Sequence, residues 1–493
     1  MNPSRTAFPS ILVFAICTTA FGQAPASASP ETQQHIQHIA ANLLPAVVLK
    51  GDSGSPSSAT HTLAERMAAL HIPGVSIAVL HHGVIEWAQG FGVTRIGGPP
   101  VTADTLFQAG SISKPVAALA ALRLVQQGKL SLDTDVNTYL TSWKLPADKV
   151  TGGKPVTLRH LLTHTGGTTV HGFPGYAAGT PVPTLVQVLN GEKPANTPAI
   201  RSEAAPGAVW NYSGGGFTIM QQAVLDVSKE PFPKLLSDTV LHPIGMSHST
   251  YQQPLPANLI PSAAVPYDGK GNPVAGGAHT YPEMAAAGLW TTPSDLARYA
   301  IEIQTSLEGK SNHVLSPEMT RQMLTPGLGH WGLGVETGGS PSNPYFSHGG
   351  VNEGFESLFV AYNHGGEGAF ITTNAQGGSA LAEEIMRSIA VEYNWPDYRP
   401  VERTVVSVDP KTLAAYIGTF QVRPDFSVVF TLENGQLIGE PTGQPKIVFH
   451  PESETRFFLI EINAEVEFFK DDQGKVTHLV LYQNGHEVKA VKQ

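Results

Sequence analysis

Apolar-rich runs of strand length predict strands on both sides of a long helical region. Residues 75–80 and 84–91 form two such runs around His81-His82-Gly83, as in a two-stranded hairpin. Residues 355–361 and 368–373 are a second pair of predicted strands, joined by the turn Asn363-His364-Gly365-Gly366. Helical spacing of apolar positions predicts helices at 33–50, 158–165, 217–227 and 380–393. We therefore expect an α+β fold in which a mainly antiparallel sheet is flanked by helices and joined by an α-rich subdomain.

The pattern changes after Trp395, where short alternating runs are separated by Asn-Gly and Gln-Gly turns. These runs predict a small all-β domain, either a sandwich or a barrel. They occupy 427–432, 446–449, 456–462, 465–470 and 476–482. The expected division of the chain is a signal peptide at 1–28, an N-terminal helix and linker at 29–62, a large domain at 63–395 and the all-β domain at 404–493.

The first residues are typical of an export signal. Arg5 precedes an apolar run at 11–16, and small residues follow as candidate cleavage positions. We expect a periplasmic or secreted protein, with a retained N-terminal anchor as the alternative. The run is too short to span a bilayer, so no stable membrane span is expected after the signal is removed. Cys17 is the single cysteine and lies inside the signal, which leaves no disulfide or thiol nucleophile in the mature chain.

Composition narrows the classes of partner. The 493 residues include 30 Lys and Arg against 40 Asp and Glu, a net charge of -10. Without a basic run or a basic-aromatic stripe, the chain is not expected to bind nucleic acid or an anionic membrane. Its hydrophobic content of 41% is enough for a large core. No pattern in the sequence indicates an oligomeric state.

A hydroxyl and an amine lie three residues apart in Ser111-Ile112-Ser113-Lys114. Pro115 follows in a first helical turn, and apolar residues then recur at helical spacing up to Val125. Side chains at i and i+3 share a helix face, so the Lys114 amine can take the proton of Ser111. The backbone N–H groups at the same helix end favour the anion formed when a carbonyl is attacked. Alone, the pair is also compatible with Ser111 acting only as a helix cap.

Further motifs follow in order along the chain. They are Leu158 to Gly167 (LRHLLTHTGG), Pro206-Gly207, Trp210 to Gly214 (WNYSG), Pro243 to Met246 (PIGM) and His348-Gly349-Gly350. With them the chain resembles the serine β-lactamase and penicillin-recognising hydrolase superfamily, in the branch of class C β-lactamases, D-aminopeptidases and β-lactamase-like esterases. The resemblance covers roughly residues 63–393. The tail is similar to the lipocalin-like β domain that often follows this hydrolase domain.

The resemblance implies a role for each matching residue. Ser111 becomes the acylated nucleophile and Lys114 its activating amine, while Tyr212 is either a second base or a proton carrier. The oxyanion would lie between the N–H groups of Ser111 and Val351, and His348 would hydrogen-bond Tyr212 or the substrate carbonyl. The positions expected to contact substrate are Gly214, Gly349 and Gly350.

Two motifs depart from the family pattern. Tyr-x-Asn has become Tyr212-Ser213-Gly214, which removes an amide that contacts the lysine and the substrate. Lys-Thr-Gly has become His348-Gly349-Gly350, which removes the cation and hydroxyl that hold the carboxylate of a β-lactam. Both changes favour small esters, amides or short peptides over lactams as substrates of an acyl-enzyme. Two alternatives stay open: a β-lactamase or D,D-peptidase proper, and a non-enzymatic module that binds penicillin or cell-wall fragments.

No cofactor or metal ion is expected. His160 and His164 are four residues apart, a spacing that could place two metal ligands on one helix. However, no Glu lies between them to act as a base, and the matching segment of the resembled family is structural. The expected partner is therefore a small ester, peptide or lactam substrate alone.

Overall fold

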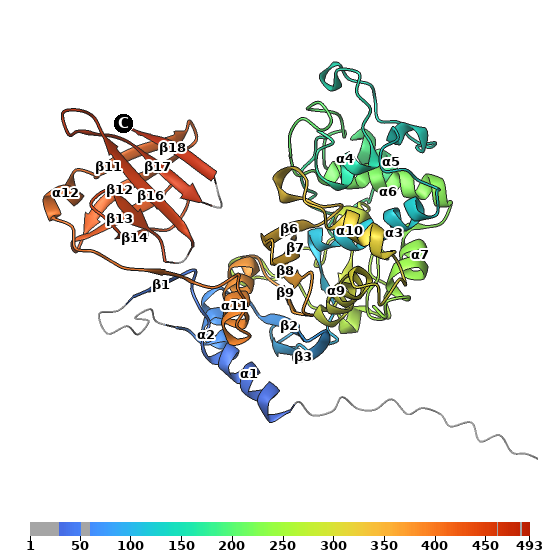
Figure 1. The fold of residues 1–493 in the computed structure, drawn as a ribbon, viewed down its shortest axis with the longest axis horizontal. Coiled ribbons are helices and arrows are strands. Elements are labelled where there is room, and N and C mark those ends of the chain that lie inside the picture. The colour runs from blue at the N-terminus through green and yellow to red at the C-terminus, as the bar shows by residue number, and fades with distance from the viewer. Residues whose placement is uncertain (1–28, 51–59, 461, 484–485) are drawn as a thin grey trace, which may run out of the picture.

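The computed structural model describes residues 29–50, 60–460, 462–483 and 486–493. The expected signal peptide at 1–28 and residues 51–59 of the expected linker lie outside the described residues. Figure 1 shows a large domain of sheet and helices and a separate C-terminal barrel. None of the helices in the described ranges combines the length and the apolar character needed to cross a bilayer.

The large domain is built on a six-stranded sheet in which every neighbouring pair is antiparallel, as the sequence pattern predicts. Its strand order is β3-β2-β9-β8-β7-β6. The strands are β2 (Gly74–His81), β3 (Val84–Gly92), β6 (Glu336–Ser340), β7 (Asn343–Asn352), β8 (Phe355–Tyr362) and β9 (Gly368–Thr373). Both predicted hairpins are therefore present in one sheet, and the second lies beside the first through β9 and β2.

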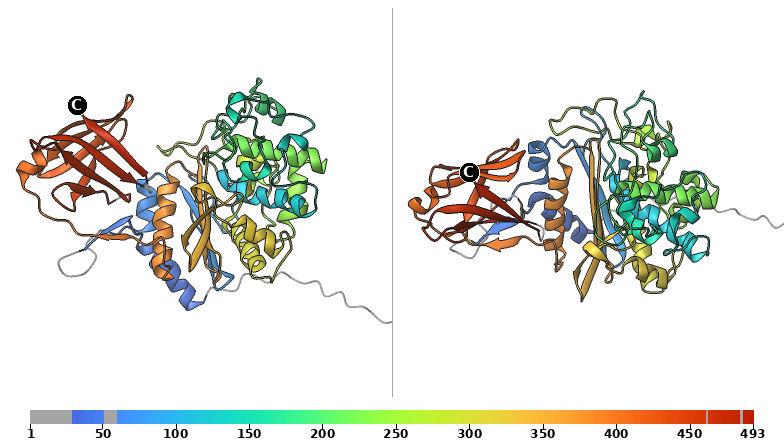
Figure 2. Two further views of the ribbon diagram at one scale, coloured as in Figure 1. Left: turned by 45° about the horizontal axis from the view of Figure 1, so that its top comes forward. Right: turned by 90° about the horizontal axis from the view of Figure 1, so that it is seen from above.

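Alternation along the strands divides the core into two layers. One face of the sheet packs against three helices from the two ends of the large domain, α1 (Pro30–Ala41), α2 (Leu63–Ala69) and α11 (Gly378–Glu392). Val75, Ile77 and Val79 of β2 belong to this layer, while Ala78 and Leu80 belong to the layer on the opposite face. Figure 2 shows the sheet edge-on between these three helices and the helical subdomain, with the barrel beyond α11.

The helical subdomain surrounds α3, most of whose residues are buried. Its helices are α3 (Ser113–Gln126), α4 (Leu158–Leu162), α5 (Leu185–Asn190), α6 (Gly214–Ser228), α7 (Phe232–Leu236), α8 (Met284–Ala287), α9 (Pro293–Leu307) and α10 (Pro317–Met323). Short turns join them: the 3-10 segments η1 (Gly110–Ile112), η2 (Val136–Thr138), η3 (Lys149–Thr151), η5 (Ile260–Ser262) and η6 (Leu328–His330), and the π-helical turn η4 (Ser237–Leu241). A two-residue ladder, β4 (Phe107–Gln108) with β5 (Trp290–Thr291), leads into η1.

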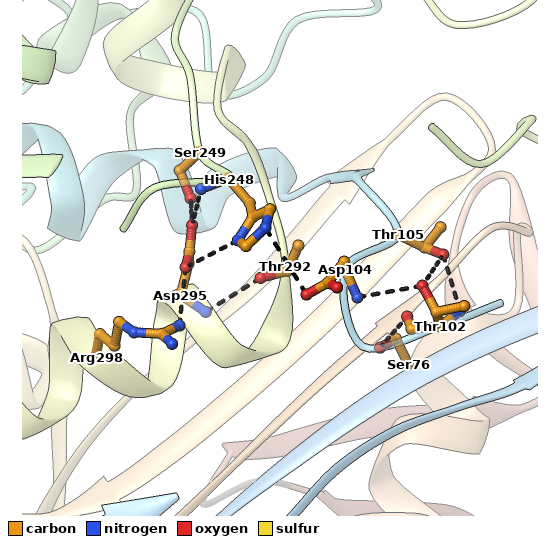
Figure 3. A network of polar contacts seen from close by, with 9 residues as sticks. All are labelled: Ser76, Thr102, Asp104, Thr105, His248, Ser249, Thr292, Asp295 and Arg298. Carbon is orange, nitrogen blue, oxygen red and sulfur yellow. Dashed lines mark hydrogen bonds and ion pairs between the residues drawn. The ribbon is translucent and has the colours of Figure 1, made fainter. Parts of the chain in front are cut away.

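A buried carboxylate fixes the start of α9. Thr292 caps this helix by accepting a hydrogen bond from the N–H of Asp295. The Asp295 carboxylate accepts hydrogen bonds from the main-chain N–H of His248 at 2.9 Å and from the hydroxyl of Ser249 at 2.8 Å (Figure 3). Arg298 donates to the same carboxylate at 3.0 Å. This network joins the segment after η4 to α9, which packs on the sheet.

The C-terminal domain is a closed eight-stranded antiparallel barrel, which agrees with the predicted all-β class. After α12 (Pro410–Ala414) its strands are β11 (Gly418–Arg423), β12 (Phe426–Glu433), β13 (Gln436–Pro441), β14 (Ile447–Pro451), β15 (Arg456–Phe458), β16 (Ala464–Lys470), β17 (Val476–Gln483) and β18 (His486–Lys492). Aromatic side chains fill its interior, with Phe468 in ring contact with Tyr416, Phe420, Phe430 and Phe457.

The predicted helix at 33–50 is wrong in its second half. Helix α1 ends at Ala41, and Val47–Leu49 forms strand β1, which pairs in parallel with β10 (Val401–Arg403). Pro45 explains the difference, because it lacks an N–H and disfavours helical geometry in the preceding residue. The β-branched Val47 and Val48 then suit a strand better than a helix.

Candidate active site

Ser111 and Lys114 lie where the sheet meets the helical subdomain. Ser111 is the middle residue of η1, and α3 begins two residues later at Ser113. Lys114 Nζ donates a hydrogen bond to Ser111 Oγ at 2.9 Å and another to the carbonyl oxygen of Ala286 at 2.9 Å. Ser113, which lies between them in the sequence, has a structural role, because its hydroxyl donates to Gly110 O and accepts from Leu289 N–H. The expected pairing of hydroxyl and amine is thus present in the structure.

Two glycines let strand β7 lie directly against the turn that carries Ser111. Gly110 has φ +53°, and a Cβ there would overlap with the backbone of Gly350 and Val351. A Cβ on Gly350 would overlap with Ala109 O. Strand β6 pairs with β7 only as far as Ser347, so the edge of β7 from His348 onward is left open toward η1. This brings the backbone N of Val351 next to the Ser111 turn.

Burial controls the charge of the amine. Lys114 is 2% exposed, and burial lowers its pKa from 10.5 to about 7. The Nζ atom lies 4.9 Å from the ring centroid of Tyr212 and 5.8 Å from that of Phe217. Its surroundings are therefore aromatic rings and a carbonyl, and a substantial fraction of the amine is neutral at pH 7.

Tyr212 lies against Lys114 and is held by a histidine from a distant segment. It precedes the cap residue of α6, Ser213, whose N–H donates to His164 Nδ1 at 3.1 Å. The His164 and Tyr212 rings are 4.2 Å apart, and the indole of Trp331 lies 5.7 Å from Tyr212. Burial raises the pKa of Tyr212 well above its usual value, and the nearby Ser111 side chain offsets only part of that rise. The phenol is therefore protonated at neutral pH.

His348 faces the same cluster from β7. Its ring lies 6.2 Å from that of Tyr212 and 5.4 Å from that of Trp331, and its Nδ1 contacts the main-chain oxygen of Gly349. No hydrogen bond joins it to Tyr212 among the described residues, so that part of the expectation is not met in this structure. Burial and the charge of Lys114 lower the pKa of His348 to about 3, and its imidazole is neutral.

Several buried polar atoms of this cluster have no hydrogen-bond partner among the described residues. They are Tyr212 Oη, His348 Nε2, His164 Nε2 and Trp331 Nε1. Buried polar groups are normally paired, because an unpaired one costs about 1–3 kcal/mol. Four such atoms around Ser111 mark a place where a polar ligand can supply the missing partners.

The three glycines expected to contact substrate have different surroundings. Gly350 is buried against Ala109, and a Cβ on Gly214 would come 2.9 Å from the ring of Phe173, so packing accounts for both. Gly349 is exposed, and a Cβ there would meet only Ser357 O at 3.9 Å. The structure therefore gives Gly214 and Gly350 a packing role, and substrate contact by all three stays a prediction.

Sequence reasoning missed His164 and Trp331. His164 lies just after α4 and has a positive φ of +56°. Its buried ring packs against the ring of Tyr212. His160, which shares its motif, instead accepts the N–H of Thr157 at the start of α4. The available signal was the run Thr163-His164-Thr165-Gly166-Gly167, in which a histidine beside glycines indicates a special backbone conformation.

Family models match both domains of the chain. A family model described as Beta-lactamase matches residues 59–392, and one described as a domain of unknown function (DUF3471) matches residues 402–491. Penicillin-binding protein 4* of Bacillus subtilis (strain 168) is 23% identical over 467 residues, which are 87% of this chain and 97% of that protein. Esterase EstB of Burkholderia gladioli is 32% identical over 213 residues, which are 41% of this chain and 52% of that protein.

A solved structure shares the fold across both domains. The octameric penicillin-binding protein homologue from Pyrococcus abyssi has a TM-score of 0.59 at 21% identity, covering 87% of this chain and 98% of that chain. Since the Beta-lactamase model spans well over half of the sequence, the chain belongs to the β-lactamase family of serine hydrolases.

Proposed function

We propose that this protein is an exported serine hydrolase that cleaves small esters, amides or short peptides through an acyl-enzyme on Ser111. The observation that carries the proposal is the contact of 2.9 Å between Ser111 Oγ and the buried Lys114 Nζ, whose pKa is lowered to about 7. A lysine that is largely neutral at physiological pH can act as a general base.

The proposed reaction assigns different proton roles to the two groups beside Ser111. Ser111 Oγ bonds to the substrate carbonyl carbon while its proton passes to neutral Lys114. Tyr212 is a protonated phenol, so it serves as a carrier that donates to the leaving group and is reprotonated from Lys114. The N–H groups of Ser111 and Val351 bind the oxyanion, and water then releases the acyl group by the reverse sequence.

The charge of the site supports esters and amides over β-lactams. A β-lactam carries a carboxylate that needs a cation for binding, and the side chain offered by β7 at that position is the neutral imidazole of His348. The esterase among the relatives is consistent with this choice, at 32% identity over part of the chain. Two relatives are named as penicillin-binding proteins, so the test of this proposal also measures penicillin binding.

A covalent probe and a substrate panel test the proposal together. Purified protein is treated with a fluorophosphonate and assayed with p-nitrophenyl esters, D-amino acid amides and nitrocefin. We expect Ser111 to be labelled and ester or amide turnover to disappear in Ser111→Ala, while Ser342→Ala, at an exposed turn, keeps both. Nitrocefin turnover exceeding ester turnover would reassign the enzyme to β-lactams. Absence of labelling together with penicillin binding by Ser111→Ala would favour the binding module.

Export rests on the N-terminal pattern of Arg5 followed by an apolar run and small residues. Expression of the full chain in a Gram-negative host gives the test. We expect the mature protein in the periplasm or medium, with an N-terminus near residue 28 by mass spectrometry. An uncleaved chain in the membrane fraction would support a retained anchor instead.

A further inference from the structure

A cluster of metal-ligand side chains lies at one end of β2, outside the proposed active site. His81 is the last residue of β2, His82 begins the turn to β3, and Glu367 lies in the turn before β9. The Glu367 carboxylate is 3.0 Å from His81 Nδ1 and 3.7 Å from His82 Nδ1. One nitrogen from each histidine and one oxygen of Glu367 all lie within 4.8 Å of one another.

The turn geometry brings together two side chains that a regular strand would separate. Successive residues of a strand point to opposite faces. His82 instead has φ +52°, and its ring centroid lies 3.8 Å from that of His81. The two turns are held in register by a hydrogen bond from Gly83 N–H to Gly366 O at 3.0 Å. The three side chains thus converge from two segments almost three hundred residues apart.

The carboxylate is also oriented by groups that are not ligands. The N–H of His82 donates to Glu367 at 3.2 Å, and the indole Nε1 of Trp395 donates at 3.3 Å. Such outer contacts are a regular feature of metal sites, because they fix the ligating oxygen before the ion arrives. Glu367 is mostly buried, whereas the side chain of His82 is 79% exposed, which leaves a path from solvent.

Two imidazole nitrogens and one carboxylate oxygen favour a divalent metal ion of intermediate softness, such as Zn²⁺. Zinc is bound by imidazole nitrogen and carboxylate oxygen at about 2.0–2.2 Å, so two of its ligands in a tetrahedron lie roughly 3.4 Å apart. The observed spacings of 3.0 and 3.7 Å bracket that value. Calcium and magnesium prefer all-oxygen ligands and suit this cluster poorly.

We propose that His81, His82 and Glu367 bind one Zn²⁺ ion, with water as the fourth ligand, and that the ion joins the β2–β3 turn to the β8–β9 turn. This differs from the expectation of no metal, which treated His81 and His82 only as turn residues. The site is independent of Ser111. His348 on β7 and Ala78 on β2 lie in one cross-strand row of the sheet, three strands apart. Both therefore lie on the face toward the helical subdomain. His81 lies on the opposite face, beside Tyr393 at the end of α11.

Calorimetry on untagged, EDTA-treated and dialysed full-length protein tests the proposal. We expect one Zn²⁺ per chain with a Kd on the order of 10 µM or tighter, a raised Tm, and no response to Mg²⁺. Co²⁺ should give the visible absorption of a four-coordinate site. His82→Ala and Glu367→Gln should each weaken Zn²⁺ binding at least tenfold, and Gln can still accept from Trp395.

Matched variants show whether Zn²⁺ is bound by this cluster or by other histidines. His364→Ala changes an exposed histidine in the same β8–β9 turn and should leave the affinity unchanged. His38→Ala tests the neighbouring group in which His35 and His38 contact Glu392. Absence of Zn²⁺ binding, or loss of it in His38→Ala but not in His82→Ala, overturns the proposal. Ester turnover and circular dichroism of each variant show that the fold is retained.

Discussion

Replacing Lys114 by Met should stabilise the large domain at pH 7 while abolishing acyl transfer. In the folded protein the pKa of this amine is about 7, and in the unfolded chain it returns to about 10.5. The unfolded state therefore binds more protons between these two values, so the lysine destabilises the fold most at low pH and least at high pH. The resulting penalty is about 4 kcal/mol at pH 7 and about 1.4 kcal/mol at pH 9.5.

Methionine removes this penalty but also the two hydrogen bonds of Nζ. The carbonyl of Ala286 is then left unpaired, which costs about 1–3 kcal/mol at every pH. At pH 7 the variant should be more stable than the wild type by about 1–3 kcal/mol, and near pH 9.5 it should lie between about 0.4 kcal/mol more stable and about 1.6 kcal/mol less stable. The difference between the two pH values, about 3 kcal/mol, does not depend on packing changes.

Urea unfolding followed by tryptophan fluorescence measures this difference. All six tryptophans lie between Trp87 and Trp395, so the signal reports the large domain and not the barrel. Lys154→Met, at an exposed lysine, is the control and should show no pH-dependent gain. A Lys114→Met effect that stays constant between pH 7 and 9.5 would refute the burial argument, and retained ester turnover in this variant would refute the assignment of the base.

Three further predictions follow from the same geometry. Because the pKa of Lys114 is about 7, kcat/KM should rise about tenfold from pH 6 to pH 8 and then level, and a flat profile contradicts the assignment. Tyr212→Phe should lower kcat by about 10²–10⁴-fold in a steady-state assay without lowering Tm, since no hydrogen bond of normal geometry to its Oη is found among the described residues. Gly350→Ala should lower both Tm and kcat/KM, because its Cβ overlaps with Ala109 O, whereas Gly349→Ala should leave Tm unchanged. Equal Tm losses in these two glycine variants would contradict the close packing of β7.

Local patterns predicted the strands well because apolar runs of strand length are bounded by turns that contain Gly and Asn. The strand at 368–373 has the predicted bounds, and the hairpin strands at 75–80 and 84–91 each extend by one or two residues. Helix ends were less predictable. The apolar pattern at 33–50 continues past Ala41, but Pro45 and parallel pairing with β10 impose a strand there.

In the candidate site, too, contacts between residues close in sequence could be predicted, whereas contacts between distant segments could not. The pairing of Ser111 with Lys114 depends on three-residue spacing, which the sequence displays directly. The contacts of Tyr212 with His164 and Trp331 join segments 48 and 119 residues away in the chain, and no local pattern encodes them. Gly350 was predicted to contact substrate, and its close packing against Ala109 O could be found only in three dimensions.

One physical cause accounts for the protonation state of all three groups around Ser111. Burial lowers the pKa of Lys114 and His348 and raises that of Tyr212. The site therefore approaches neutrality: the proposed base is an amine, the proposed proton donor is a phenol, and the imidazole carries no charge. Such a site stabilises charge where it develops during attack, at the oxyanion, more than charge that the substrate already carries. The proposed neutral acyl substrates suit it for that reason, and a permanently anionic one would need a cation that β7 does not supply.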